Sequence, residues 1–218
     1  MKPILIYCYD AYCGWCYGAS SVIKKISVTY KDKLHIEVLS GGMMIGEHVM
    51  PIEKIAHFIQ NSYTRVEELS GIKFGEDFLW HINNPDKSDW VLNSEKSAIA
   101  LCIVKEYYPE RQLEFATDLQ YALNYEGRDL DDDETYRHLT DKYNIQSEAF
   151  YTKLNAEEYK EMAYYEFDLM KQLQVNGYPT IFIQTDELKF IMVAKGFTDY
   201  DTINKRIDNI LNENKTSN

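Results

Sequence analysis

The sequence predicts an α/β protein in which an all-helical block interrupts a sheet-forming frame. Three observations support this fold class. A strand, a helix and a second strand follow one another within the first 40 residues. Helical periodicity then runs from Pro51 to about residue 174, and strand patterns return after Gly177, followed by one last helix. We therefore expect residues 1–48 and 175–218 to form one domain and residues 49–174 to form an inserted helical domain.

The composition indicates a globular chain with an acidic surface. Of its 218 residues 45% are hydrophobic, the formal net charge is −12 and the pI is near 4.9. This acidity argues against nucleic acid and anionic membranes as partners, because clustered Lys and Arg bind both. No apolar run approaches the roughly 18 residues that span a bilayer. The N-terminus also lacks the features of a secretory signal. We expect a cytoplasmic protein, unless a leader peptide has been removed.

The first predicted elements form a βαβ unit. Ile4 to Tyr9 is a short β-branched and aromatic run, typical of a buried strand. Apolar residues recur at helical spacing between Cys16 and Tyr30, and Leu34 to Leu39 alternates as a second strand. A strand, helix and strand in this order predict a parallel strand pair. Ser40-Gly41-Gly42 then ends the pattern as a turn.

The middle of the chain is predicted to be helical. Pro51 fits the first position of an amphipathic helix, and residues 61–89 predict short helices and loops because their apolar residues lack a clear period. Ser94 is expected to cap the next helix. Asn155 with Glu158 resembles a capping box at the start of a long helix.

The C-terminal part returns to strands. Thr180 to Ile183 and Lys189 to Ala194 predict two strands joined by a short turn. Thr198 and Asp201 are expected to cap a last amphipathic helix. These elements would complete the sheet that the first 40 residues begin.

Cys13 and Cys16 lie at the turn between the first strand and the first helix. Two Cα atoms one helical turn apart are about 5 Å from each other, which a disulfide can bridge. The first thiol lies at a helix N-terminus, where backbone N–H groups and the helix dipole favour a thiolate. The thiolate is the form that attacks disulfides. The spacing therefore indicates a redox-active pair.

The order of these pieces resembles the thioredoxin superfamily, and a helical block inserted between two halves resembles its DsbA-like branch. The resemblance covers nearly the whole chain. It is closest to the bacterial DsbA-like proteins predicted to be disulfide isomerases, which carry an Asp-x-x-Cys-x-Trp-Cys motif. Here that motif is Asp10-Ala11-Tyr12-Cys13-Gly14-Trp15-Cys16. The segment Gly177-Tyr178-Pro179-Thr180 is similar to the cis-proline loop of the superfamily.

The resemblance implies a role for each of these residues. Cys13 would be the exposed nucleophile, and Cys16 would be shielded and would resolve the mixed disulfide. Substrate contacts would come from Gly14, Trp15, Tyr178 and Pro179. The peptide bond before Pro179 would be cis, and the Tyr178 backbone would pair with an extended substrate segment.

Three positions near the pair refine these expectations. Gly14 and Trp15 stand where strongly oxidising DsbA proteins have Pro-His. Without that histidine we expect a less oxidising pair. Asp10 is a candidate proton relay for Cys16, but its position suits capping of the turn as well, and we favour the cap.

Metal sites compete for the same residues. A structural zinc site commonly needs two close ligand pairs, and the sequence has one. Cys8, Cys13 and Cys16, with Cys102 as a fourth ligand, match a plant-type ferredoxin spacing. However, Cys8 lies in an apolar strand and Cys102 on an apolar helix face, so we interpret both as packing residues. The acidic run 129–133 lacks the Gly and Glu of a calcium-binding EF-hand loop. We predict no metal.

We therefore predict a thiol–disulfide oxidoreductase that exchanges protein disulfides and needs no cofactor. Its partners would be protein disulfides or dithiols and an unidentified redox partner, and a reducing cytosol would favour reduction or isomerisation. Two alternatives stay open. Kappa-type glutathione transferases and hydroxychromene-carboxylate isomerases share the split fold but use glutathione and a single nucleophile, so Cys16 argues against them. A non-enzymatic thioredoxin-like adaptor is the other.

Overall fold

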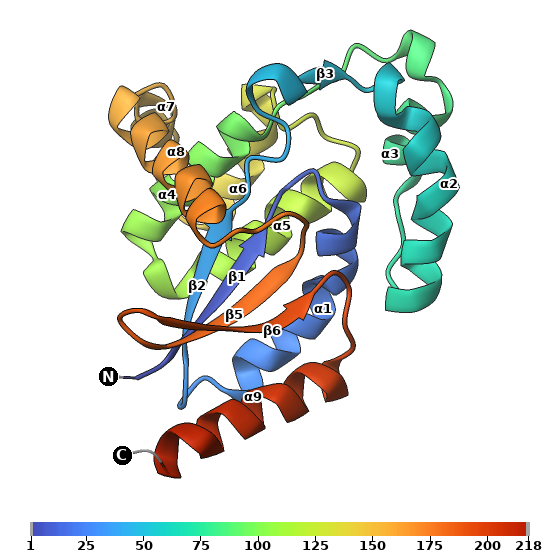
Figure 1. Ribbon diagram of the computed structural model, residues 1–218. Helices are drawn as coiled ribbons and strands as arrows, with labels where there is room; N and C mark the ends of the chain where they lie inside the picture. Colours follow the sequence, from blue (N-terminus) through green and yellow to red (C-terminus); the bar gives the residue numbers. More distant parts are fainter. Residues whose placement is uncertain (1, 217–218) are drawn as a thin grey trace.

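The computed structural model describes residues 2–216. Its central sheet has four strands in the order β2-β1-β5-β6 (Figure 1). The strands are β1 (Ile4–Tyr9), β2 (His35–Ser40), β5 (Thr180–Asp186) and β6 (Lys189–Lys195). β1 and β2 are parallel, as predicted, whereas β5 runs antiparallel to both β1 and β6. The two ends of the chain therefore meet in the middle of the sheet, where β1 pairs with β5.

Helices make up most of the remaining chain. The α-helices are α1 (Gly14–Thr29), α2 (Glu53–Ser70), α3 (Glu76–Asn83), α4 (Ser94–Tyr107), α5 (Gln112–Asn124), α6 (Arg137–Lys142), α7 (Ser147–Leu154), α8 (Glu157–Gln172) and α9 (Tyr200–Thr216). The 3₁₀ helices are η1 (Gly46–His48), η2 (Pro85–Lys87), η3 (Pro109–Arg111) and η4 (Asp133–Tyr136). Two short antiparallel strands, β3 (Met50–Pro51) and β4 (Val91–Leu92), join the two ends of the segment that contains α2 and α3.

The helices cover the two faces of the sheet differently. Successive strand residues point to opposite faces. Leu5 and Tyr7 of β1 belong to the main core, which also contains buried residues of α1, α5 and α9. Ile6 and Cys8 belong to a smaller cluster on the other face, which includes Met170 of α8. In Figure 1, α9 and α8 accordingly lie on opposite sides of the sheet.

The observed architecture confirms the predicted fold class, a thioredoxin fold with a helical insertion. The main core is continuous from the sheet into the helices, because Leu5, Leu101 and Phe115 belong to one cluster. The division into residues 1–48 with 175–218 and residues 49–174 stays a prediction. Within residues 2–216, no helix is both long enough and apolar enough to cross a membrane.

The helix predicted to begin at Pro51 differs from the expectation. Pro51 lies in β3, and α2 continues through residues predicted as short helices and loops. Its polar residues are compatible with a helix because their side chains bond to carbonyls one turn earlier. Asn61 Nδ2, for example, donates to the His57 carbonyl at 2.9 Å. Gly71, with φ +76°, takes the left-handed conformation that ends the helix.

Two predicted helix caps are displaced by one or two positions. The side chain of Asn93, rather than Ser94, accepts a hydrogen bond from the Glu95 N–H at 3.1 Å and caps α4. Asp199, not the predicted pair, accepts from the Thr202 N–H at 2.9 Å at the start of α9. The displacement at α4 leaves the Ser94 hydroxyl available for a contact at the candidate site.

Candidate active site

The cysteine pair lies where β1 turns into α1. The Cys13 N–H donates to the Asp10 carbonyl at 3.1 Å, which closes the turn. Cys13 is the N-cap residue of α1, and its sulfur accepts a hydrogen bond from the Cys16 N–H at 3.3 Å. A backbone N–H directed at a sulfur stabilises negative charge on that atom. This geometry agrees with the predicted position of the pair at a helix N-terminus.

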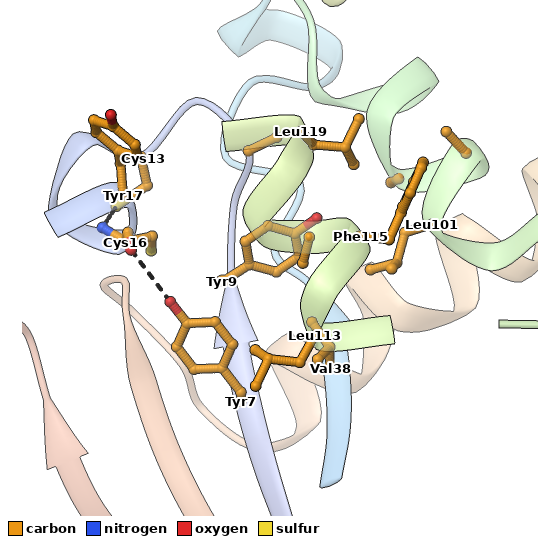
Figure 2. Close-up of a cluster of buried hydrophobic side chains, with 14 of the residues drawn as sticks. Tyr7, Tyr9, Cys13, Cys16, Tyr17, Val38, Leu101, Leu113, Phe115 and Leu119 are labelled. Carbon is orange, nitrogen blue, oxygen red and sulfur yellow. Dashed lines mark hydrogen bonds between the residues drawn. The ribbon is translucent and has the colours of Figure 1, made fainter. Parts of the chain in front are cut away.

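The two thiols are more buried than the sequence suggests. Cys16 is 0% exposed, as expected, and Cys13 is 7% exposed, so the expectation of an exposed nucleophile is wrong in this conformation. The Cys13 thiol donates to the Tyr178 carbonyl at 3.6 Å, and that loop covers it. Burial raises the pKa of Cys16, which therefore keeps its proton. Figure 2 shows Cys16 next to Tyr7, whose hydroxyl donates to the Cys16 carbonyl at 3.4 Å.

The loop opposite the cysteines contains a cis peptide bond between Tyr178 and Pro179, which confirms the expectation from the motif. The Pro179 carbonyl accepts from the Gly196 N–H at 2.7 Å, and the Tyr178 hydroxyl donates to the Gly41 carbonyl at 2.8 Å. These contacts connect the loop to the residue after β6 and to the glycine turn after β2. They hold the Tyr178 carbonyl beside the Cys13 sulfur.

Gly41→Ala is expected to displace this loop. A Cβ at Gly41 would lie 2.3 Å from Cζ and 2.6 Å from the hydroxyl of Tyr178, so the ring must move. We expect a loss of about 1–3 kcal/mol in the free energy of unfolding and a lower rate of disulfide exchange. Gly177→Ala, in the cis-proline loop itself, is the matched control, since its Cβ would meet only Lys195 Cε at 3.6 Å. Urea unfolding and an exchange assay of both variants check the prediction, and equal effects would contradict it.

Asp10 is buried at the base of the turn, with 1% of its surface exposed. Its Oδ1 accepts from the Tyr12 N–H and from the Ser94 hydroxyl, each at 3.0 Å, and its Oδ2 accepts from the Met43 N–H at 2.7 Å. Asp10 thus caps the turn and connects it to α4 and to the loop after β2. Burial and Cys13 have the largest effects on the pKa of Cys16, and both raise it; a hydrogen bond from the Asp10 backbone lowers this pKa, and the negative charge of the Asp10 side chain raises it by less. The role as a proton relay stays a prediction.

Asp10→Asn is expected to change the pH dependence of stability. Burial raises the pKa of Asp10 above its ordinary 3.8, although hydrogen bonds from Met43, Tyr12 and Ser94 oppose this shift. The stability linked to this group is fully present below pH 3.8 and is lost as the pH rises through the raised pKa. The free energy of unfolding of the wild type, relative to Asp10→Asn, should therefore fall as the pH rises from about 4 to 7. Urea unfolding at several pH values measures it. A difference that grows with pH would show that the fold favours the charged form.

A cavity of about 390 Å³ opens beside Cys13. Three of the predicted substrate-contact residues, Gly14, Trp15 and Tyr178, line it together with Cys13. Pro179 is buried and does not line the cavity. The structure thus brings Cys13 and Tyr178 of the cis-proline loop to one hollow, whereas Cys16 is fully buried and, like Pro179, does not line it. Trp15 also contacts Phe197 at a ring-centroid distance of 6.2 Å.

Most of the cavity wall was missed by sequence reasoning. It comes from the loop after β2, from α2, and from α3 with the segment before it. The residues are Met43, Met44, Ile55, Phe58, Ile59, Tyr63, Val66, Phe74 and Phe78. Phe74 is central, with its ring centroid 5.3 Å from that of Tyr17 and 5.4 Å from that of Phe78. The recurrence of Ile55 and Ile59 at helical spacing was the available signal, but it does not say what the helix packs against.

The other two cysteines lie apart from this site. Cys8 is fully buried in the small cluster on the opposite face, and burial raises the pKa of its thiol to about 12. Cys102 is 1% exposed, and burial likewise raises its pKa. Both are packing residues, as interpreted from the sequence. Among residues 2–216, no group of three or more His, Cys, Asp or Glu side chains is arranged to hold a metal ion.

Several solved structures share this fold. A proposed protein disulfide isomerase from Nitrosomonas europaea superposes with a TM-score of 0.85 at 20% identity, covering 98% of this chain and 99% of that one. The cytosolic disulfide reductase DsbM from Pseudomonas aeruginosa gives 0.75 at 22% identity, over 96% and 98%. A 2-hydroxychromene-2-carboxylate isomerase gives 0.66 at 16% identity, over 99% of both chains. At identities of 16–22%, these superpositions show a common fold alone.

Comparison of sequences identifies the family. No protein of curated function matches the chain. The sequence pattern of the DSBA-like thioredoxin domain matches residues 4–208, nearly the whole chain. The chain therefore belongs to the DsbA-like thioredoxin family, whose members are thiol–disulfide oxidoreductases.

Proposed function

We propose that this protein is a cytoplasmic disulfide reductase or isomerase that acts on protein disulfides through Cys13 and Cys16. The observation that carries the proposal is the position of the Cys13 sulfur. It accepts a backbone N–H at the start of α1, lies beside the buried Cys16 and faces the Tyr178 carbonyl. A disulfide-exchange centre needs an activated thiol, a resolving thiol within reach and a surface that positions the substrate chain.

The reaction follows from these positions. The Cys13 thiolate attacks one sulfur of a substrate disulfide, a mixed disulfide forms, and the other substrate sulfur leaves as a thiolate that takes up a proton. Cys16 then loses its proton and attacks the Cys13 sulfur, which releases the second substrate thiol. The two electrons of the Cys13–Cys16 dithiol have passed to the substrate. A dithiol reductant, the unidentified redox partner, restores the pair. In isomerisation a substrate thiol resolves the mixed disulfide instead.

Cys16 must lose its proton in the second step, and the Asp10 carboxylate is the base proposed to receive it. The raised pKa of the Cys16 thiol means that this step needs a base. The raised pKa of Asp10 brings its carboxylate closer to the strength that such a base needs. Asp10→Asn should therefore slow resolution of the mixed disulfide more than its formation. Stopped-flow measurement of both steps separates these effects.

The cavity beside Cys13 indicates the class of substrate. None of its described lining residues is Lys, Arg, His, Asp or Glu, and most are aliphatic or aromatic. An apolar side chain next to the substrate disulfide would be buried there favourably. Glutathione carries carboxylates at both ends, and no basic residue of the lining would pair with them. The cavity thus supports protein disulfides over glutathione as substrates, although the Pseudomonas reductase has been solved with GSH.

Phe58→Glu is expected to weaken the binding of substrates that carry apolar side chains next to their disulfide. Phe58 lines the cavity but is 65% exposed, so the substitution adds a charge at the rim with little cost to the fold. We expect reduction of a peptide disulfide flanked by Leu and Phe to slow by about tenfold. Val28→Glu, at a position 63% exposed on α1 and outside the cavity, should have no effect. A rate that Phe58→Glu leaves unchanged would contradict the proposed substrate contact.

The proposed activity itself is tested by a redox titration of the cysteine pair, followed by mass spectrometry. It is combined with insulin-reduction and scrambled-ribonuclease assays. We expect a reversible Cys13–Cys16 disulfide, with turnover of insulin in the presence of a dithiol reductant. If the pair forms no reversible disulfide, the proposal is wrong. The ribonuclease assay distinguishes an isomerase from a reductase.

A further inference from the structure

The face of the sheet opposite to α1 and α9 is incompletely covered. α8 packs over β2, and beyond it Phe190 and Met192 of β6 are 39% and 52% exposed. Between α8 and this face lies a cavity of about 870 Å³, larger than the 390 Å³ cavity beside Cys13. We name it the α8 groove. It has an apolar floor and an acidic rim, represented by Ile6, Leu39, Leu169, Phe190, Glu158 and Glu161.

The α8 groove is separate from the cavity beside Cys13. The two cavities share no lining residue. Ile6 lines the groove, whereas the next residue, Tyr7, points to the other face and contacts Cys16. Any ligand of the groove is therefore bound on the far side of the sheet from the cysteine pair.

Exposed apolar side chains gather around the groove. Met162 and Tyr165 of α8 are 41% and 64% exposed, and with Phe190 they line one hollow. Single exposed apolar residues are common on protein surfaces, whereas a contiguous patch with a polar rim marks an interaction site. The apolar lining indicates an occupant with an apolar face.

The charged residues of the groove all have the same sign. Its described lining contains Glu37, Glu158, Glu161 and Glu166, with no Lys, Arg or His. Glu37 and Glu166 bind Lys105, each at 2.7 Å. Glu158 and Glu161 form no ion pair within residues 2–216. Two free carboxylates on the rim would attract a cationic partner.

The length of the groove indicates the kind of partner. α8 and its C-terminal end line it from Glu158 to Leu173, which spans about 22 Å at the rise of an α-helix. A hollow this long along a helix suits a chain segment better than a compact small molecule, as in helix-in-groove recognition. A second copy of this chain fits poorly, because its net charge is −12.

We propose that the α8 groove binds a basic amphipathic segment of a partner protein. The apolar face of the segment would pack on Ile6, Leu169 and Phe190, and its Lys or Arg side chains would pair with Glu158 and Glu161. The site would hold a protein partner while Cys13 remains free on the other face.

The test uses the full chain and a labelled helical peptide of about 18 residues, long enough to span the groove. One version is built from Leu and Lys and a matched version from Leu and Glu. We expect the Leu/Lys peptide alone to bind. Glu158→Lys with Glu161→Lys should weaken binding by about tenfold or more, as should Met162→Ala with Tyr165→Ala. Glu47→Lys with Asp86→Lys is the control. Both of its positions are exposed and outside the groove, and the net charge changes equally.

Four results would overturn the proposal. No binding of the Leu/Lys peptide is the first. If Glu47→Lys with Asp86→Lys weakens peptide binding as much as Glu158→Lys with Glu161→Lys, the peptide is attracted by the net negative charge of the protein and not by the groove. If the bound peptide protects Cys13 from an alkylating reagent, the peptide lies in the cavity beside Cys13 and not in the α8 groove. If the wild type sediments as a dimer and Tyr165→Ala as a monomer, the groove is an interface between two copies of this chain.

Discussion

Cys13→Ser is expected to lower the rate of insulin reduction by about a thousandfold or more, because it removes the attacking sulfur. Cys16→Ser should also stop turnover but should leave the nucleophile in place. The mixed disulfide between Cys13 and its substrate would then accumulate, since nothing within the protein resolves it. Non-reducing electrophoresis and mass spectrometry of the two variants distinguish these outcomes. Cys102→Ala, at a buried thiol outside the site, should keep the wild-type rate.

The same pair of variants separates the alternative functions. Activity with glutathione that survives Cys16→Ser would favour the transferase and isomerase lineage, which uses a single nucleophile. Partner binding that is unchanged in Cys13→Ser, together with no exchange activity in the wild type, would favour an adaptor. Loss of turnover in both variants, with trapping in Cys16→Ser alone, supports the oxidoreductase.

Lys105→Met is expected to reduce the free energy of unfolding by about 3 kcal/mol. The Lys105 ammonium donates to Glu37 and Glu166, each at 2.7 Å, and its side chain is 14% exposed. Glu166, with 9% side-chain exposure, also accepts from the Ser40 N–H at 2.7 Å. Removing the lysine leaves this carboxylate buried without its cation, which costs more than the ion pair itself contributes. For a chain of this size the melting temperature should fall by roughly 6–12 °C.

Lys142→Met is the matched control, because Lys142 pairs with Asp118 at 2.7 Å but its side chain is 47% exposed. An ion pair at the surface contributes at most about 1 kcal/mol. Burial alone would lower the pKa of Lys105, but the charges of Glu166 and Glu37 raise it above the ordinary 10.5. Its contribution is therefore present below pH 10.5 and is lost as the pH rises through the raised value. Calorimetry of both variants measures the effect, and equal losses would contradict the buried-pair argument.

The sequence predicted the order of the elements and the two motifs of the site, because these depend on local patterns. The Cys13–Cys16 spacing, the apolar strand before it and the Gly-x-Pro-Thr loop are each read within a few residues. That the two motifs contact each other, although Cys13 and Tyr178 are 165 residues apart, was predicted from the family resemblance alone. The structure shows this contact. The burial of Cys13 could not be predicted, since it depends on how the loop around Tyr178 packs against its sulfur.

The errors in the helices have local physical causes. Asn155 was expected to open α8, but α7 ends one residue before it. Its side chain turns back and donates to the Tyr151 carbonyl at 2.8 Å, so it serves the end of α7. Ala156 is the N-cap of α8 and provides no side-chain cap. A residue between two helices has two sets of unpaired backbone groups within reach, and the sequence does not say which set it satisfies.

The contact of Ser94 with Asp10 shows the same limit at the site. Both residues stood out in the sequence, one as a cap and the other as a cap or relay. Their hydrogen bond joins positions 84 residues apart. No periodicity records such a contact, because it depends on how α4 packs against the β1 turn.

The pairing of β1 with β5 has a consequence for synthesis on the ribosome. Ile4 pairs with Gln184, so most of the chain must be synthesised before β1 can pair with its antiparallel neighbour β5. The nascent protein emerges with Cys13 and Cys16 early and with the Tyr178–Pro179 loop late. Contacts so distant in sequence slow folding, because a long loop must close before they form. The candidate site is therefore complete only after translation of the last fifth of the chain has begun, and an incomplete chain carries the two thiols without the Tyr178–Pro179 loop.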